Sequence, residues 1–88
     1  MKWYLIYQAE DRTRNLKYGP CYSTNDDITK PDQWTRPASL YVVPDGTKAG
    51  LDYWVICDSE RAHLFFTTLD GRMWRSETKL ESFPDKGW

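Results

Sequence analysis

Two apolar segments with a period of two stand out in this sequence, WYLIYQ at residues 3–8 and DYWVICD at residues 52–58. Successive side chains of an extended strand point to opposite faces, and here both faces would be largely apolar. That pattern is typical of a strand covered on both sides. One carboxylate, Asp52, stands at the start of the second segment, and another, Asp58, closes it and is interpreted as a residue that ties the following turn. The segments therefore predict buried strands, and they raise the question of what Asp52 does there.

The rest of the chain predicts further strands and no helix of normal length. Four more segments are predicted to be strands: 17–24, 39–43, 62–70 and 72–78. The pair Asp70-Gly71 is a strong signal for a hairpin between the last two. Aromatic residues make up 16% of the chain, and aromatic side chains favour strands. We therefore expect an all-β fold.

Besides the polar, turn-like segment 10–17, three segments are predicted to be irregular: 25–34, 44–50 and 79–88. The first is either a loop or one short helical turn, capped by Asn25 or Asp26 and ended by Pro31. The second, PDGTKAG, has the composition of a turn.

The second half of the chain repeats the order of features in the first half. Residues 4–8 match 54–58 at an offset of 50, and residues 21–24 match 74–77 at an offset of 53. The repeats would cover about 1–50 and about 51–88. A period of roughly 40–50 residues in an all-β chain is typical of a β-propeller, in which each unit is a four-stranded antiparallel blade.

Two blades are too few to close a propeller, which needs about four to eight. Repeat units bury their faces only against neighbouring units. The 88 residues suffice for one small domain. We therefore expect a single partial-propeller unit, either part of a longer chain or completed by other copies as a homo-oligomer.

Composition argues against several classes of partner. Twelve Lys and Arg balance 13 Asp and Glu, a formal net charge of −1, which gives no reason to expect nucleic acid or an anionic membrane. No apolar stretch reaches about 18 residues, and the first residues lack the pattern of a secretory signal. Cys21, Cys57 and His63 do not make a metal site, so neither a metal nor another cofactor is expected. We expect Cys57 to be a buried thiol, not bonded to Cys21, and His63 to be a partly exposed strand residue.

Several longer motifs resemble one enzyme family. They are KWYLIYQ, then YSTNDDITKPDQWTRP, then LDYWVICDSERAHLFFTTLDGRMWRSETKLESFP. In this order they look like the α-L-arabinofuranosidases of glycoside hydrolase family 62, and the resemblance covers nearly the whole chain. The loop before GLDYWVICD is shorter than the family usually has.

The resemblance implies a five-bladed propeller that removes arabinofuranosyl branches from arabinoxylan with inversion. Such hydrolysis pairs a general acid with a general base, and this family adds a third carboxylate that orients the acid and tunes its pKa. Asp52 aligns with that third carboxylate. The segments with the general base and the general acid have no counterpart here, so the chain by itself is expected to be inactive. The family is typically secreted, but no signal in this chain indicates a location.

Two further residues are candidate substrate contacts through the resemblance. Arg75 holds the place of the arginine in the family's YRS motif, and Trp74 replaces the usual tyrosine beside it. Alternatives stay open for each candidate. An aspartate before a strand is commonly a turn or edge residue, and Arg75 fits a salt bridge between strands. The whole chain could instead be an oligomeric carbohydrate-binding or structural module, or a scaffold whose exposed aromatic faces serve a protein partner.

Overall fold

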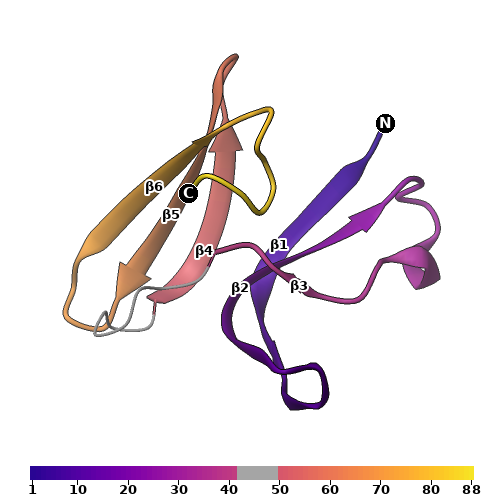
Figure 1. The fold of residues 1–88 in the computed structure, drawn as a ribbon, viewed down its shortest axis with the longest axis horizontal. Coiled ribbons are helices and arrows are strands. Elements are labelled where there is room, and N and C mark those ends of the chain that lie inside the picture. Colours follow the sequence, from indigo (N-terminus) through magenta and orange to yellow (C-terminus); the bar gives the residue numbers. More distant parts are fainter. Residues whose placement is uncertain (42–49) are drawn as a thin grey trace.

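The computed structural model describes residues 1–41 and 50–88, and in these ranges it confirms an all-β fold (Figure 1). Six strands form two antiparallel sheets with the orders β1-β2-β3 and β4-β5-β6. The strands are β1 (Trp3–Asp11), β2 (Leu16–Asn25), β3 (Ala38–Ser39), β4 (Gly50–Cys57), β5 (Arg61–Thr68) and β6 (Met73–Lys79). Two single-turn 3₁₀ helices, η1 (Arg12–Arg14) and η2 (Pro31–Gln33), lie in the connections of the first sheet.

The first sheet is built on the β1–β2 hairpin. Its register pairs Trp3 with Asn25 and Ala9 with Gly19. The tight connection is closed by Asp11, whose carboxylate accepts from Thr13, and by Asn15, which adopts a left-handed conformation. β3 adds only a short third strand along β2.

The second sheet is a meander in which β5 is the central strand. Its residues alternate between buried and half-buried along the whole strand, as expected when one face lies in the core. The predicted hairpin at Asp70-Gly71 is confirmed, and Gly71 has φ +85°, which a side chain would disfavour.

The hydrophobic core lies between the two sheets. Its buried members come from the linker after β3 and from β4 and β5: Leu40, Tyr53, Leu64 and Phe66. Ile6 and Tyr22 pack on them from the first sheet. The C-terminal segment crosses back between the sheets in Figure 1, and Phe83 and Trp88 contact the same core. No residue of β1 is fully buried: Ile6 packs on the core, whereas Trp3 and Leu5 are exposed, so the expected burial of this strand on both faces is wrong for the described chain.

Three further expectations need correction. Each sheet has three strands within the described residues, where four were expected. Of the strand predicted at 39–43, only Ser39 lies in a strand, Leu40 and Tyr41 do not, and the rest lies outside the described residues. Pro31 begins a 3₁₀ helix instead of ending a helical turn, because its fixed φ suits the first helical position. The turn predicted at 44–50 lies almost entirely outside the described residues, and Gly50 already belongs to β4.

β1 and β4 lie against each other and run in opposite directions. Gln8, near the end of β1, contacts Asp52, near the start of β4, whereas Tyr4 contacts Phe83 beyond the end of β6. These directions argue against equating residues 4–8 with 54–58 as the same strand of two repeats. The repeat boundaries stay a prediction.

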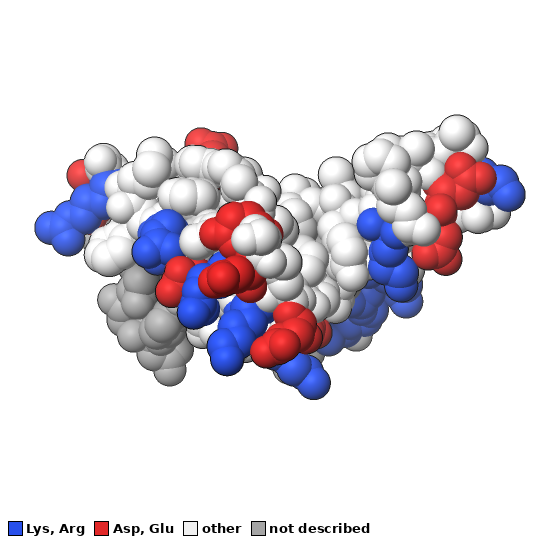
Figure 2. Space-filling model, turned by 90° about the horizontal axis from the view of Figure 1, so that it is seen from above, with Lys and Arg blue, Asp and Glu red and all other residues white. Residues whose placement is uncertain are grey.

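Acidic and basic side chains are interspersed on the face shown in Figure 2, without a large area of one sign. This distribution agrees with the formal net charge of −1.

Candidate functional site

Asp52 lies in a β-bulge near the start of β4. The register between β4 and β5 shifts between Leu51 and Trp54, so that Asp52 and Tyr53 together face the single residue Phe66. Asp52 has φ +55°, in the left-handed region. In bulges with a left-handed first residue that residue is usually glycine. Here an aspartate takes a backbone conformation that a residue without a side chain would adopt more easily.

Gly50 and Tyr53 explain how the chain folds into this bulge. A Cβ at Gly50 would lie 2.6 Å from Phe66 Cδ2 and 2.7 Å from the Tyr53 hydroxyl. The Gly50 N–H donates to that hydroxyl over 3.1 Å. Burial is the main reason that the pKa of Tyr53 is raised, and the neighbouring Tyr18 and Tyr41 add to the shift. The buried ring of Tyr53 thus anchors the bulge and leaves Asp52 on the surface.

The Asp52 side chain is exposed, and its carboxylate makes no hydrogen bond or ion pair to any residue that the structure describes. Its backbone N–H points to Gln8 Oε1 at 3.4 Å. Gln8 Nε2 in turn donates to the Tyr18 hydroxyl over 2.5 Å. The carboxylate is therefore free for solvent or a ligand, while its backbone is held from β1.

Other aspartates in the chain are used differently. Four of them accept hydrogen bonds that close turns: Asp11, Asp27, Asp58 and Asp70. A hydrogen bond from the threonine two residues further on lowers the pKa of Asp11, and the same holds for Asp27. The interpretation of Asp58 as a turn residue is confirmed, since its Oδ1 accepts from the N–H groups of Glu60 and Arg61. Asp52 does not follow this pattern within the described chain.

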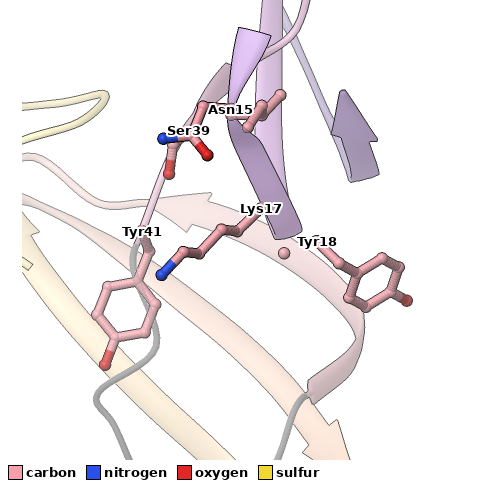
Figure 3. A pocket seen from close by; sticks show the side chains of 7 residues that line it. Asn15, Lys17, Tyr18, Ser39 and Tyr41 are labelled. Atoms are coloured by element: carbon pink, nitrogen blue, oxygen red, sulfur yellow. The ribbon is translucent and has the colours of Figure 1, made fainter. Parts of the chain in front are cut away.

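A cavity of about 340 Å³ is lined by residues at the start of β2 and around β3. Its lining residues are Asn15, Leu16, Lys17, Tyr18, Gly19, Ser39 and Tyr41. In Figure 3 the Lys17 ammonium reaches toward Tyr41, Asn15 lies beside Ser39, and the ring of Tyr18 points to the other side. Tyr18, one of these lining residues, also accepts a hydrogen bond from Gln8, but neither Gln8 nor Asp52 lines the cavity.

Trp74 and Arg75 lie on opposite faces of the second sheet. They are consecutive in β6, so their side chains point to opposite faces. Trp74 is 41% exposed and donates from Nε1 to Thr68 Oγ1 over 3.1 Å. β5 separates both residues from Asp52. Their role as substrate contacts stays a prediction.

Arg75 belongs to a polar network on the outer face of the second sheet. His63 Nε2 lies 2.8 Å from Asp58 Oδ2, and His63 Nδ1 lies 3.0 Å from Arg75 Nη1. Arg75 also donates to Glu77 Oε2 over 3.0 Å. Because a guanidinium only donates, Nδ1 must accept, and the proton sits on Nε2 facing Asp58. The His63 hydrogen bond is the main cause that lowers the pKa of Asp58. The ion pair of Arg75 is with Glu77 on its own strand, not between strands as the alternative expected, and only the hydrogen bond to His63 joins β6 to β5.

The thiols and the histidine give one correction and one confirmation. Cys21 is buried, whereas Cys57 is exposed because it ends β4 at the margin of the sheet, so the predicted burial of Cys57 is wrong. Both are free thiols. His63 is a strand residue with 20% of its side chain exposed, as predicted.

Within residues 1–41 and 50–88, no group of His, Cys, Asp and Glu is arranged to hold a metal ion. No helix among the described residues is long and apolar enough to cross a membrane.

Sequence comparison assigns this all-β chain to the glycoside hydrolases. The model of glycosyl hydrolase family 62 matches residues 2–87, and the chain belongs to that family. The chain is also 36% identical over 84 residues to alpha-L-arabinofuranosidase C of Cellvibrio japonicus (strain Ueda107). The match covers 96% of this chain and 12% of that protein, so the chain spans only about an eighth of the relative. No solved structure matches. The family resemblance inferred from the motifs is confirmed.

Sequence reasoning missed Gln8 and Tyr18 as neighbours of Asp52. Gln8 is the polar residue that ends the apolar WYLIYQ segment, and a polar side chain at that position was the feature of the sequence that could have marked it as functional. The partner of Gln8 lies 44 residues away, which no local pattern indicates.

Proposed function

We propose that this chain is a two-sheet segment of a β-propeller arabinofuranosidase, and that Asp52 is its contribution to the active site. The substrate class is arabinoxylan with arabinofuranosyl branches. The observation that carries the proposal is the Asp52 carboxylate, exposed and unengaged in the described structure, on a left-handed bulge. Strained backbone and bulges concentrate at functional sites, where they direct a side chain to a ligand.

The proposed role of Asp52 is to orient and tune a neighbouring acid. In an inverting hydrolase one carboxylic acid protonates the leaving oxygen, and a carboxylate on the opposite face activates water. A third negative charge near the acid keeps a proton on it to higher pH, because ionising the acid would place two like charges together. Asp52 supplies such a charge. The general base and the general acid would come from segments outside these 88 residues, so we expect no turnover from this chain alone.

The proposal is tested first by activity and then by binding. The purified 88-residue protein is incubated with arabinoxylan, and released arabinose is measured. We expect none. Turnover that Asp52→Asn abolishes would contradict the proposed incompleteness of the catalytic set.

Arabinoxylan oligosaccharides are then titrated into ¹⁵N-labelled protein. We expect the amide signals of residues 50–53 to shift in the wild type and less in Asp52→Asn. Asp26→Asn is the matched control, because Asp26 is equally exposed and lies in the loop after β2. Equal responses in the two variants would remove Asp52 from the site.

A second candidate function, an oligomeric propeller module that binds carbohydrate, has its own support. The outer faces of both sheets expose large apolar side chains: Trp3 and Leu5 on the first sheet, Ile56 and Met73 on the second. Trp54 and Phe65 stack on the outer face of the second sheet with centroids 5.3 Å apart. Such faces are the ones a propeller blade buries against its neighbours.

Solution mass by light scattering tests this candidate. A dimer or trimer that dissociates in Trp54→Ser supports assembly through these faces. A monomer at high micromolar concentration contradicts it.

A further inference from the structure

Gln8 is the residue through which the first sheet reaches Asp52. It lies on the face of β1 that is directed toward the second sheet, two residues after Ile6, which packs on the core. Its side chain is half-buried. The Asp52 N–H points to its Oε1 at 3.4 Å, and its Nε2 donates to the Tyr18 hydroxyl over 2.5 Å. One side chain thus contacts β2 and β4 together.

The orientation of the Gln8 amide follows from its partners. A backbone N–H only donates, so the amide oxygen must face Asp52. The amide nitrogen then faces the Tyr18 hydroxyl, which accepts and keeps its own hydrogen for solvent or a ligand. Turning the amide over would set two donors against each other at Asp52. The Asp52 N–H therefore selects the amide orientation, and Tyr18, whose hydroxyl can either donate or accept, holds the amide nitrogen at the other end.

The backbone of Asp52 needs such a partner. A left-handed residue with a side chain is strained relative to the ordinary conformations, because its Cβ lies too close to the following carbonyl oxygen. The bulge also leaves the extra residue outside the regular ladder between β4 and β5. Without an acceptor, the Asp52 N–H would depend on solvent alone, and other conformations that turn the carboxylate elsewhere would compete.

We propose that Gln8 is the positioning residue of Asp52. It holds the Asp52 backbone N–H, so that the carboxylate stays directed outward from the bulge, where the end of β1 meets the start of β4. The inference rests on the proposed function, because that function requires the Asp52 carboxylate to keep one direction. It adds to that function a second residue, from the other sheet, without which Asp52 is misaligned. Tyr18 acts through Gln8 and not on Asp52.

The test measures Asp52 itself and needs no turnover. Exchange of the Asp52 amide with solvent and the intraresidue H–N to Hα cross-peak, which is strong at positive φ, are recorded by NMR. The variants are Gln8→Leu, Gln8→Glu, Tyr18→Phe and Gln33→Leu. Gln8→Leu keeps a similar volume and removes both hydrogen bonds. Gln8→Glu retains an acceptor for the Asp52 N–H. Gln33→Leu is the matched control, because Gln33 is exposed in η2.

We expect Gln8→Leu to raise the exchange rate at Asp52 by about threefold to tenfold, the range for loss of one hydrogen bond. The cross-peak should weaken as other backbone conformations become populated. Gln8→Glu should stay within twofold of the wild type, which a purely structural defect would not reproduce. Unchanged exchange and cross-peak in Gln8→Leu would overturn the proposal, as would an equal change in Gln33→Leu.

If Gln8→Leu does not fold, Tyr18→Phe decides the question. It removes the hydrogen bond that holds Gln8 Nε2, so the side chain of Gln8 is free to leave Asp52, and we expect exchange at Asp52 to rise by about twofold; no rise overturns the proposal. The sugar titration separates this inference from the proposed function. A wild type that ignores arabinoxylan oligosaccharides defeats the function, whereas the exchange rates still decide on Gln8.

Discussion

Asp52→Gly should make the protein more stable and remove the response of the site to sugar. The side chain of Asp52 makes no hydrogen bond or ion pair among the described residues that glycine would lose. Glycine keeps the N–H that points to Gln8. At φ +55° glycine avoids a strain of about 1–2 kcal/mol. It loses more backbone entropy on folding, which offsets about 0.5–1 kcal/mol. The net expectation is about 0.5–1 kcal/mol of added stability.

The assay is thermal unfolding followed by circular dichroism. For a chain of 88 residues, the unfolding entropy is about 2.1 cal/mol/K per residue, so this free energy raises Tm by about 3–5 °C. Asp52→Ala should lie below the wild type, because alanine keeps the Cβ clash and lacks the tolerance of aspartate for this conformation. Asp26→Gly, at an exposed position without a positive φ, should lower Tm slightly.

The reasoning is refuted if Asp52→Gly lowers Tm relative to the wild type. The carboxylate would then stabilise the fold, and the strain would not be evidence for a functional side chain. If Tm rises but the sugar response survives, the strain is real and the functional assignment of Asp52 is wrong.

Three further outcomes are expected. Gly50→Ala should lower the free energy of unfolding by about 1–3 kcal/mol, because a Cβ would lie 2.6 Å from Phe66 Cδ2. Unfolding in urea measures this difference, and stability equal to the wild type would contradict the packing at the bulge. Asp58 has a lowered pKa in the fold, so its contribution to stability is present above its unfolded pKa of about 4 and is lost as pH falls below that value. Asp58→Asn should therefore flatten the acid side of the curve of stability against pH, and a curve parallel to that of the wild type would exclude this linkage. With a thiol reagent, Cys57 should react faster than Cys21, because Cys57 is exposed and Cys21 is buried. Burial raises the pKa of both thiols, so access to the reagent decides the order; two thiols that react equally fast in the native protein would rule out this arrangement.

The candidate site shows how far sequence reasoning reaches. The family motif singled out Asp52, and the turn role of Asp58 followed from its place at the end of a strand. The sequence predicted a regular strand from residue 52, yet the structure has a bulge there with a left-handed aspartate. No local pattern distinguishes this aspartate from the one that closes a turn at Asp58. Strain at one residue becomes visible only when the paired strand fixes the register.

The amino-acid sequence by itself determined the strands, the hairpin at Asp70-Gly71 and the membership in a hydrolase family, because periodicity, turn chemistry and motifs are local properties. The tertiary structure alone decided that Gln8 meets Asp52, that Cys57 is exposed, and that β1 and β4 run in opposite directions. These features depend on how two sheets pack over a shared core. Packing joins residues far apart in the chain, and the pattern of either segment taken separately is compatible with many partners.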